Sequence, residues 1–154
     1  MKPKNYTKIS VLDPTTGQSV DAKEWVHRDD RTSAEWVIIE NTRYGFRFAL
    51  HKRVLTNDNF AAALKAAAGF AEGGRTGTRI EWITIYNAIH TAHLNDVLTK
   101  IGGNAIARLS YWTEEMDEDK SSAPGAWFYF GTGGFLNTNT ARFSSMASRV
   151  IRDL

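Results

Sequence analysis

Apolar and polar residues alternate over short runs in the last third of the chain, the period that a half-buried strand produces. Ala107–Trp112 follows this pattern, and Ala126–Phe130 is an aromatic run whose composition suits a pleated surface. The glycines of 131–134 predict a turn, because glycine adopts positive φ without steric cost. We expect a return strand to begin at Phe135 and a closing strand to contain Val150 and Ile151.

The first fifty residues also have the pattern of short strands separated by turn residues. Ile9, Val11 and Val20 flank the turn segment 13–17, which predicts either a hairpin or an arm lying on a neighbouring molecule. Trp25–Val26, Glu35–Glu40 and Phe46–Leu50 are interpreted as further strands, with a turn over 41–45. The pattern therefore predicts that residues 1–53 are a β-rich N-terminal extension or the first strands of the domain that follows.

Helical spacing of apolar residues begins after this region. Asn57 or Asp58 is expected to cap a first helix, which Gly73 and Gly74 would end. The buried face of this helix is predicted to hold Phe60, Leu64, Ala67, Ala68 and Ala71.

A second helix is predicted to begin at a capping box, in which the side chains of Thr78 and Glu81 satisfy each other's free amides. The apolar pattern restarts near Thr91 and stops at 102–103, which indicates either one bent helix or two helices joined near His90. Helices set among short strands predict the α+β fold class. The apolar stripes hold Trp82, Ile85, Tyr86 and Ile89 and then Leu94, Val97, Leu98 and Ile101.

Five segments in this order resemble the C-terminal domain of the Legionella collagen-like protein, a C-type-lectin-like domain of bacterial and phage proteins. The resemblance covers roughly residues 55–154, and the family's usual Arg-Leu-Pro is Arg79-Ile80-Glu81 here. It implies a C-type-lectin-like domain over 54–154, in which N- and C-terminal strands pair and two helices flank a mixed or antiparallel sheet. The five segments are Thr78–Trp82, Leu94–Gly103, Tyr111–Glu115, Ala126–Gly134 and Ser148–Arg152.

Composition narrows the classes of function. The 154 residues contain no cysteine, which excludes disulfides, a thiol nucleophile and a cysteine-type zinc site. A net charge of +2 without a clustered basic face argues against nucleic acid. No apolar segment follows the charged start or approaches the length of a membrane span, so we expect neither standard export nor membrane insertion.

Two clusters could hold a metal ion, and neither has a matching ligand pattern. His90 and His93 lie at helical spacing, but two histidines three apart more often form a polar face than a zinc site. The acidic run of Glu114, Glu115, Asp117, Glu118 and Asp119 could bind calcium, yet it lacks the triplets of calcium-dependent lectins. We expect a solvated surface loop there, and no metal or cofactor.

The motifs of enzymes are also missing. The formylglycine-generating enzymes related to this fold need cysteines, and the G-x-S-x-G elbow of serine hydrolases does not occur. The glycines of 131–134 lie between two strands, whereas a phosphate cradle requires a following helix. We therefore predict no catalytic residues and no enzymatic activity.

The long loops at 112–126 and 135–147 are the predicted ligand face, which is where the resemblance also places it. Ordinary solvated loops remain the alternative. We further expect Trp82, Trp112 and Trp127 to be buried and mutually close. The candidate ligand-binding residues are Trp112, Glu114, Glu115, Asn137, Asn139 and Arg142.

The resemblance implies a non-catalytic recognition or assembly module. The first hypothesis is a phage or prophage virion protein, structural or host-attaching, assembled in the host cytoplasm. The alternative is a bacterial lectin-like domain that binds carbohydrate or protein, in the cytoplasm or at the cell surface by a non-standard route. Expected partners are further copies of the chain through residues 1–24, other virion or surface proteins, and a glycan or protein receptor.

Overall fold

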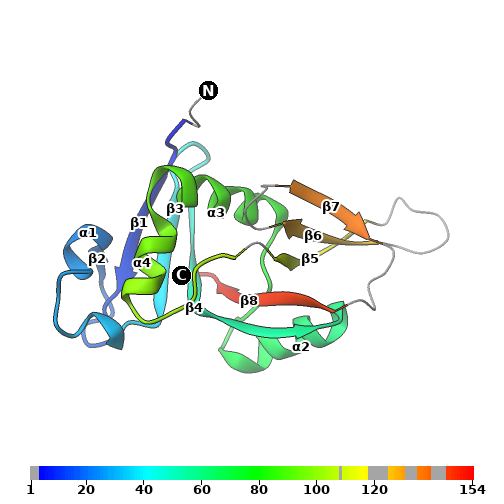
Figure 1. Cartoon of the computed structure of the whole chain (residues 1–154), viewed down its shortest axis with the longest axis horizontal. Helices are drawn as coiled ribbons and strands as arrows, with labels where there is room; N and C mark the ends of the chain where they lie inside the picture. The colour runs from blue at the N-terminus through cyan, green and yellow to red at the C-terminus, as the bar shows by residue number, and fades with distance from the viewer. Residues whose placement is uncertain (1–3, 108, 118–124, 131–134, 140–144) are drawn as a thin grey trace. The chain divides into compact units, whose positions relative to one another are not determined.

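The computed structural model describes residues 4–107, 109–117, 125–130, 135–139 and 145–154, and its fold is α+β (Figure 1). Two compact units divide the chain. The first unit comprises Met1–Arg53, Thr84–Ala105 and Asp153–Leu154, and the second comprises Val54–Ile83 and Ile106–Arg152. The division after residue 53 falls where the pattern of the sequence changes, but residues 84–105 belong to the first unit rather than to the domain predicted over 54–154.

The first unit contains an antiparallel sheet with the strand order β2-β1-β3-β4. β4 is long, and its pairing with β3 runs from Phe46 to His51 before the strand continues into the second unit. The short helices α1 and η1 lie between β2 and β3 in the sequence. These elements are β1 (Thr7–Leu12), β2 (Ser19–Asp21), α1 (Ala22–Trp25), η1 (Arg31–Ser33), β3 (Trp36–Asn41) and β4 (Phe46–Asp58).

β1 is an internal strand of this sheet. It pairs with β2 on one side, where Val11 faces Val20, and with β3 on the other, where Val11 faces Val37. The hairpin interpretation of this region is confirmed, since β1 pairs with strands of its own unit and not with those of a neighbouring molecule. Because both edges of β1 are already hydrogen-bonded, β1 has no edge to offer a neighbouring molecule.

Trp25 lies in a helix and not in the strand that its apolar neighbourhood suggested. The Asp21 side chain accepts a hydrogen bond from the amide of Lys23 at 2.8 Å and caps the start of α1. Trp25 is fully buried, and its indole N–H donates to the carbonyl of Arg31 at 3.0 Å. A short apolar pair fits the end of a helix as well as it fits a strand, so periodicity alone could not separate the two.

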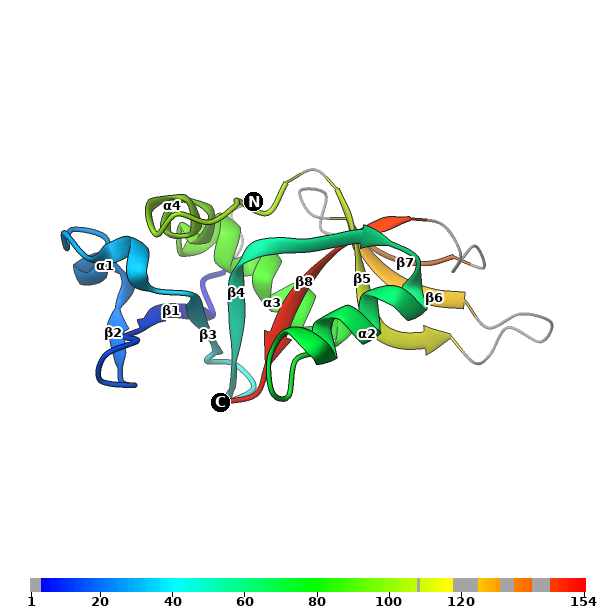
Figure 2. The same ribbon diagram turned by 90° about the horizontal axis from the view of Figure 1, so that it is seen from below.

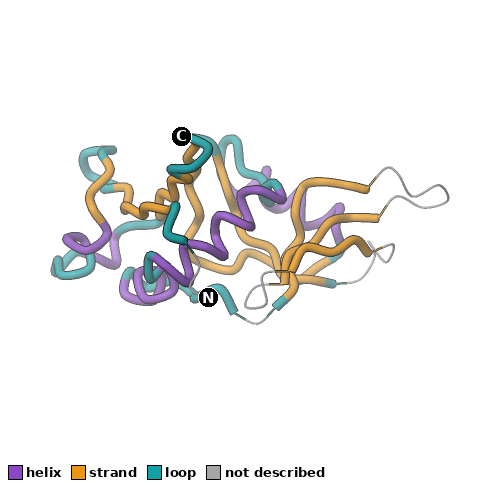
Figure 3. The backbone as a smooth tube through the Cα atoms, turned by 90° about the horizontal axis from the view of Figure 1, so that it is seen from above, coloured by secondary structure: helices purple, strands orange, loops and turns teal. Residues whose placement is uncertain are grey.

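The apolar pattern of residues 79–101 folds as two helices, α3 (Arg79–Thr91) and α4 (Leu94–Lys100), as one of the two alternatives predicted (Figure 3). Between them His93 adopts φ 57°, in the left-handed region that ends a helix. The first five residues of α3 belong to the second unit and the rest, from Thr84, to the first.

Asn87 on α3 fastens the start of β1 within the first unit. Its side-chain oxygen accepts from the Tyr6 amide at 3.3 Å and from the Thr7 hydroxyl at 3.2 Å. Its amide nitrogen donates to the carbonyl of Lys4 at 2.8 Å. The beginning of the described chain is therefore held by its own unit.

Lys52 is buried in the first unit, and its ammonium group contacts three oxygen atoms. The Nζ atom donates to the carbonyls of Thr32 at 2.9 Å and Ile101 at 3.0 Å, and lies 3.4 Å from a carboxylate oxygen of Glu35. Gly103 permits this arrangement, because a Cβ at that position would collide with the Lys52 backbone. The second glycine of the predicted helix stop is thus needed for a close approach of two backbones.

The second unit contains a mixed sheet with the order β4-β8-β5-β6-β7. β5 is parallel to β8 and antiparallel to β6, and β6 is antiparallel to β7. Helix α2 packs on β8 and β5 (Figure 2). The elements are α2 (Phe60–Phe70), β5 (Ser110–Asp117), β6 (Gly125–Phe130), β7 (Phe135–Asn139) and β8 (Met146–Arg152).

The start and the buried face of α2 differ from the prediction. Its cap is Asn59, whose side chain accepts from the Ala62 amide at 2.9 Å, because β4 extends through Asn57 and Asp58. The helix ends at Phe70, before the glycine pair. Ala63 is buried in place of Ala68, which is exposed. The cap therefore lies one or two residues later than predicted.

β5 begins at Ser110 and continues to Asp117. The strand predicted over Ala107–Trp112 therefore starts later and runs further. Glu114 and Glu115 lie on this strand, so the expectation of a surface loop is wrong for the first part of the acidic run. Glu118 and Asp119 lie outside the described residues.

Candidate functional site

The start of α3 is built by the predicted capping box. The Glu81 amide donates to the Thr78 hydroxyl at 3.2 Å, and the Thr78 amide donates to a Glu81 carboxylate oxygen at 2.8 Å. The capping box is confirmed, and the missing proline of the family pattern leaves the helix start intact.

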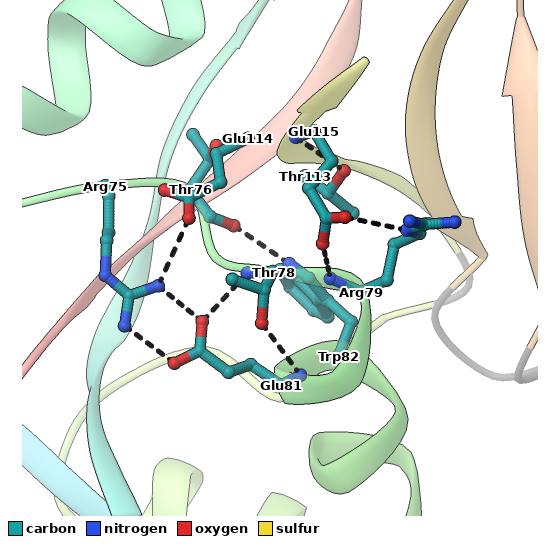
Figure 4. Close-up of polar contacts among 9 residues, drawn as sticks. All are labelled: Arg75, Thr76, Thr78, Arg79, Glu81, Trp82, Thr113, Glu114 and Glu115. Atoms are coloured by element: carbon teal, nitrogen blue, oxygen red, sulfur yellow. Dashed lines mark hydrogen bonds and ion pairs between the residues drawn. The ribbon is translucent and has the colours of Figure 1, made fainter. Parts of the chain in front are cut away.

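Glu81 has a second partner in Arg75, which lies in the loop before the helix. The guanidinium group of Arg75 pairs with both carboxylate oxygens of Glu81, one of them at 2.6 Å. Only 8% of the Glu81 side chain is exposed. Glu114 of β5 lies 3.9 Å from the same guanidinium group, so Arg75 joins the helix start to the strand (Figure 4).

Glu115 binds the first residue of α3 through both of its oxygens. One oxygen accepts from the Arg79 backbone amide at 2.6 Å, and the other accepts from the Arg79 Nε atom at 2.8 Å (Figure 4). A carboxylate at this end of a helix is stabilised by the free amides and the helix dipole. Glu115 therefore occupies the position at which the helix would attract an anion.

An irregularity in β5 explains how two consecutive glutamates reach the same region. Adjacent side chains of a regular strand point to opposite faces. The pairing of β5 with β6 shifts register between Trp112 and Met116, as a β-bulge does, and the Glu114 amide donates to the carbonyl of Gly77 at 2.7 Å. The bulge turns this part of β5 towards the loop before α3.

Two tryptophans lie beneath this network on different faces of the sheet. The Trp82 ring stacks on Tyr111 with centroids 5.0 Å apart, and its N–H donates to the carbonyl of Thr76 at 2.9 Å. The Trp112 ring meets Phe60 of α2 at 5.5 Å. Both tryptophans are fully buried, as predicted. Because Tyr111 and Trp112 are neighbours on β5, their side chains point to opposite faces of the sheet. The expectation that Trp82, Trp112 and Trp127 lie mutually close stays a prediction. The side chain of Trp127 lies outside the description.

A buried arginine completes the interior of the second unit. Arg149 of β8 is fully buried, and burial lowers its pKa to about 10, while its hydrogen bond to Tyr111 favours the charged form. At neutral pH this side chain remains a cation, which ties the closing strand to the ring on which Trp82 stacks.

The candidate ligand residues separate into three groups. Trp112 has no exposed surface, and its N–H donates to the carbonyl of Asp58 at 2.8 Å, so it is a core residue and not a ligand contact. Glu114 and Glu115 are about one-third exposed and engaged with Arg75 and Arg79. Asn137 and Asn139 lie on β7, with side chains outside the description, and Arg142 lies outside the described residues.

An open hollow of about 380 Å³ adjoins the Arg79–Glu115 pair. Ile80 and Ile83 form its apolar wall, and Ile80 is 41% exposed. Arg79 and Glu115 at its rim are already hydrogen-bonded to each other and their charges cancel. The hollow therefore offers mainly apolar contact through Ile80 and Ile83.

Metal ligands do not converge in the part of the chain that the structure describes. No group of three histidine or acidic side chains suitable for an ion occurs among these residues. His90 is exposed and its ring meets Tyr86 edge-on at 4.5 Å, whereas His93 forms the break before α4.

Arg75 was missed by the sequence analysis, and the role of Arg79 was not foreseen within its motif. The available signal was the opposite charge of the segments 75–79 and 114–115, which the resemblance places in one domain.

No family model matches the chain, and no curated protein matches its sequence. None of the described helices is long and apolar enough to cross a membrane.

Proposed function

We propose that the second unit is a C-type-lectin-like domain that acts as a non-catalytic recognition or assembly module. The observation that carries this proposal is the place of its first and last strands. β4 enters the unit at Val54, β8 closes it at Arg152, and the two strands are neighbours in the sheet. The Thr56 and Ser148 hydroxyls meet across them at 2.6 Å. Paired terminal strands are the feature that the resemblance implies for this fold.

The contacts between the family-like segments support the same proposal. The segment Thr78–Trp82 is joined to Tyr111–Glu115 by the Arg79–Glu115 pair and by the stacking of Trp82 on Tyr111. Residues that define the resemblance thus maintain the fold of the unit. Recognition is then assigned to the loops that the rigid sheet carries, where binding residues are commonly found.

The role that we propose is that of a phage or prophage virion protein, structural or host-attaching, working as several copies. Multiple copies raise avidity without new contacts. Because β1 is internal, copies would have to meet through another part of the chain than β1. Glycan or protein binding at a bacterial surface is the alternative outcome of the test.

The test combines mass and binding measurements on the full chain. Light scattering is expected to give a multiple of 17.3 kDa. Fluorescently labelled protein is expected to bind intact bacteria or a glycan array. A variant with Asn137→Ala, Asn139→Ala and Arg142→Ala should lose binding and keep its melting temperature, whereas Lys23→Ala in the first unit should retain binding.

Two results would contradict the proposal. One is a monomer that binds neither cells nor glycans. The other is a turnover of substrate that survives purification and disappears when a described side chain of the second unit is replaced. Detection of the chain in purified phage particles by mass spectrometry would separate a virion role from that of a surface lectin.

A further inference from the structure

The turn between β3 and β4 belongs to the first unit (Figure 1). The buried side chain of Asn41 holds this turn in place. The Asn41 carboxamide oxygen accepts from the amides of Arg43 and Tyr44, each at 3.0 Å, and its nitrogen donates to the Thr84 hydroxyl at 3.1 Å. Gly45 closes the turn at φ 73°. The residues at the tip are therefore fixed before any partner arrives, which lowers the entropy lost on binding.

This turn presents an aromatic ring and a cation side by side. Tyr44 is 65% exposed, more than any other large hydrophobic side chain among the described residues. The guanidinium group of Arg43 lies 4.7 Å from the centre of the Tyr6 ring. Burial raises the pKa of Tyr6. The Tyr6 side chain is therefore uncharged at neutral pH, and the face of its ring attracts the Arg43 guanidinium group through a cation–π contact.

Further cations continue the surface along the sheet. Lys8, Glu40 and Arg47 are aligned across β1, β3 and β4, so their side chains share one face. Lys8 and Arg47 are exposed, and within the described residues neither forms an ion pair. With Arg43 of the neighbouring turn, this surface holds three cationic side chains and the single carboxylate of Glu40.

We propose that the turn patch, formed by Tyr6, Lys8, Arg43, Tyr44 and Arg47, binds an acidic polysaccharide that carries uronate groups. The exposed Tyr44 ring offers an apolar face to the C–H side of a sugar ring, with its hydroxyl at the wet end. Arginine matches the two oxygens of a carboxylate with its planar fork. The positive charge complements a polymer with repeated carboxylates. This inference concerns the first unit and does not rest on the function proposed for the second.

Nucleic acid is the other polyanion that such a surface could meet, and the patch fits it less well. Proteins that bind duplex DNA with strong salt dependence contact about 6–10 phosphates, whereas the patch offers three cations and lies next to one carboxylate. Binding of single strands uses several stacking rings in a groove. Here one ring is exposed at the tip of a turn.

The experiment measures binding of the full chain to fluorescein-labelled oligogalacturonate at low salt. Dextran of similar length serves as the neutral control, and a labelled single-stranded oligonucleotide tests the other polyanion. Tyr44→Ala and Arg43→Gln are each expected to weaken oligogalacturonate binding about tenfold. Tyr44→Phe should restore most of the affinity, because it keeps the ring.

Lys65→Gln, which removes an exposed cation from α2, is the matched charge control and should leave binding unchanged. Added salt should weaken binding by screening the charges. Melting curves establish that every variant is folded. The proposal is overturned if oligogalacturonate does not bind, if dextran binds equally well, or if Tyr44→Ala and Arg43→Gln bind as the parent does. Tighter binding of the oligonucleotide through these residues would also overturn it.

Discussion

At the start of α2, Asn59 accepts a hydrogen bond from the Ala62 amide, and Asn57 makes no such bond within the described residues. We predict that Asn59→Ala lowers the free energy of unfolding by about 1 kcal/mol, the usual loss for an N-cap. Asn57→Ala, exposed on β4, should change it by less than about 0.5 kcal/mol. Urea unfolding of the two variants is the measurement. Equal effects would show that the cap had been misassigned.

Two glycines provide a second comparison between single residues. Gly103 lies against the Lys52 backbone, whereas a Cβ at Gly69 of α2 would meet no atom within 4 Å. Gly103→Ala is expected to destabilise the chain by more than about 1 kcal/mol, because backbone atoms cannot move aside easily. Gly69→Ala should stabilise it by about 0.5 kcal/mol, because alanine favours the helix. Melting temperatures that move in the same direction for both variants would contradict this account.

Residue-level inference from the sequence succeeded where the signal is local. The capping box of Thr78 and Glu81 depends on residues three apart, and the structure contains both of its hydrogen bonds. The cap of α2 was placed one or two residues early, because three polar residues in succession can each cap a helix and β4 determines which one does. The burial of Trp82 and Trp112 was also predictable, because both lie at apolar positions of their segments.

At the scale of elements, the start of α3 depends on a pair of charges that is largely removed from water, with 19% of the Arg75 side chain and 8% of the Glu81 side chain exposed. Glu81→Ala would leave the Arg75 guanidinium group without its bidentate partner and the Thr78 amide without its acceptor. We predict that Glu81→Ala lowers the free energy of unfolding by about 3 kcal/mol, because removing one partner leaves the other charge buried and unpaired. Thermal unfolding followed by circular dichroism measures it.

The matched control is an exposed pair of the same kind on another helix. Asp96 and Lys100 are four residues apart on α4, with 2.9 Å between their charged atoms and about half of each side chain exposed. Asp96→Ala should cost no more than about 0.5 kcal/mol. A loss at Asp96 as large as that at Glu81 would mean that burial does not set the strength of these pairs.

The elements themselves were more predictable than their limits. Strand composition located β6 and β7, and helical spacing located α3 and α4, because both signals arise within one element. The end of β5 was not predictable from its own residues. Acidic residues usually face water, and only their pairing with Arg75 and Arg79 shows why Glu114 and Glu115 remain in a strand.

At the scale of the whole molecule, we expect no dependence on calcium. Glu114 and Glu115 each have an arginine partner, Arg75 and Arg79, so an ion would have to displace these pairs. EDTA should leave the melting temperature unchanged, since a bound ion would raise it by mass action. A fall of several degrees that added calcium reverses would contradict this prediction and point to the acidic residues after Asp117.

The assignment of residues 84–105 to the first unit could not be predicted. The sequence shows an amphipathic helix, but its partner could have been any apolar face. The partner is determined by polar contacts such as those of Asn87. Its carboxamide accepts a hydrogen bond from the Tyr6 amide and donates one to the carbonyl of Lys4. A polar residue on a mostly apolar helix is a weak signal of such a contact.

This interleaving has a consequence for the order in which the chain folds. A hydrogen bond of the first unit joins Thr7 and Asn87 across 80 positions of sequence. During synthesis the four strands of that unit leave the ribosome long before α3, which contacts them through Asn87. Until then the apolar face of these strands is exposed to water. Contacts between residues so far apart in sequence slow folding, and strands whose apolar face is exposed are prone to aggregate. We therefore expect the nascent chain to need protection until about residue 105 has left the ribosome, even though its earliest strands are already complete.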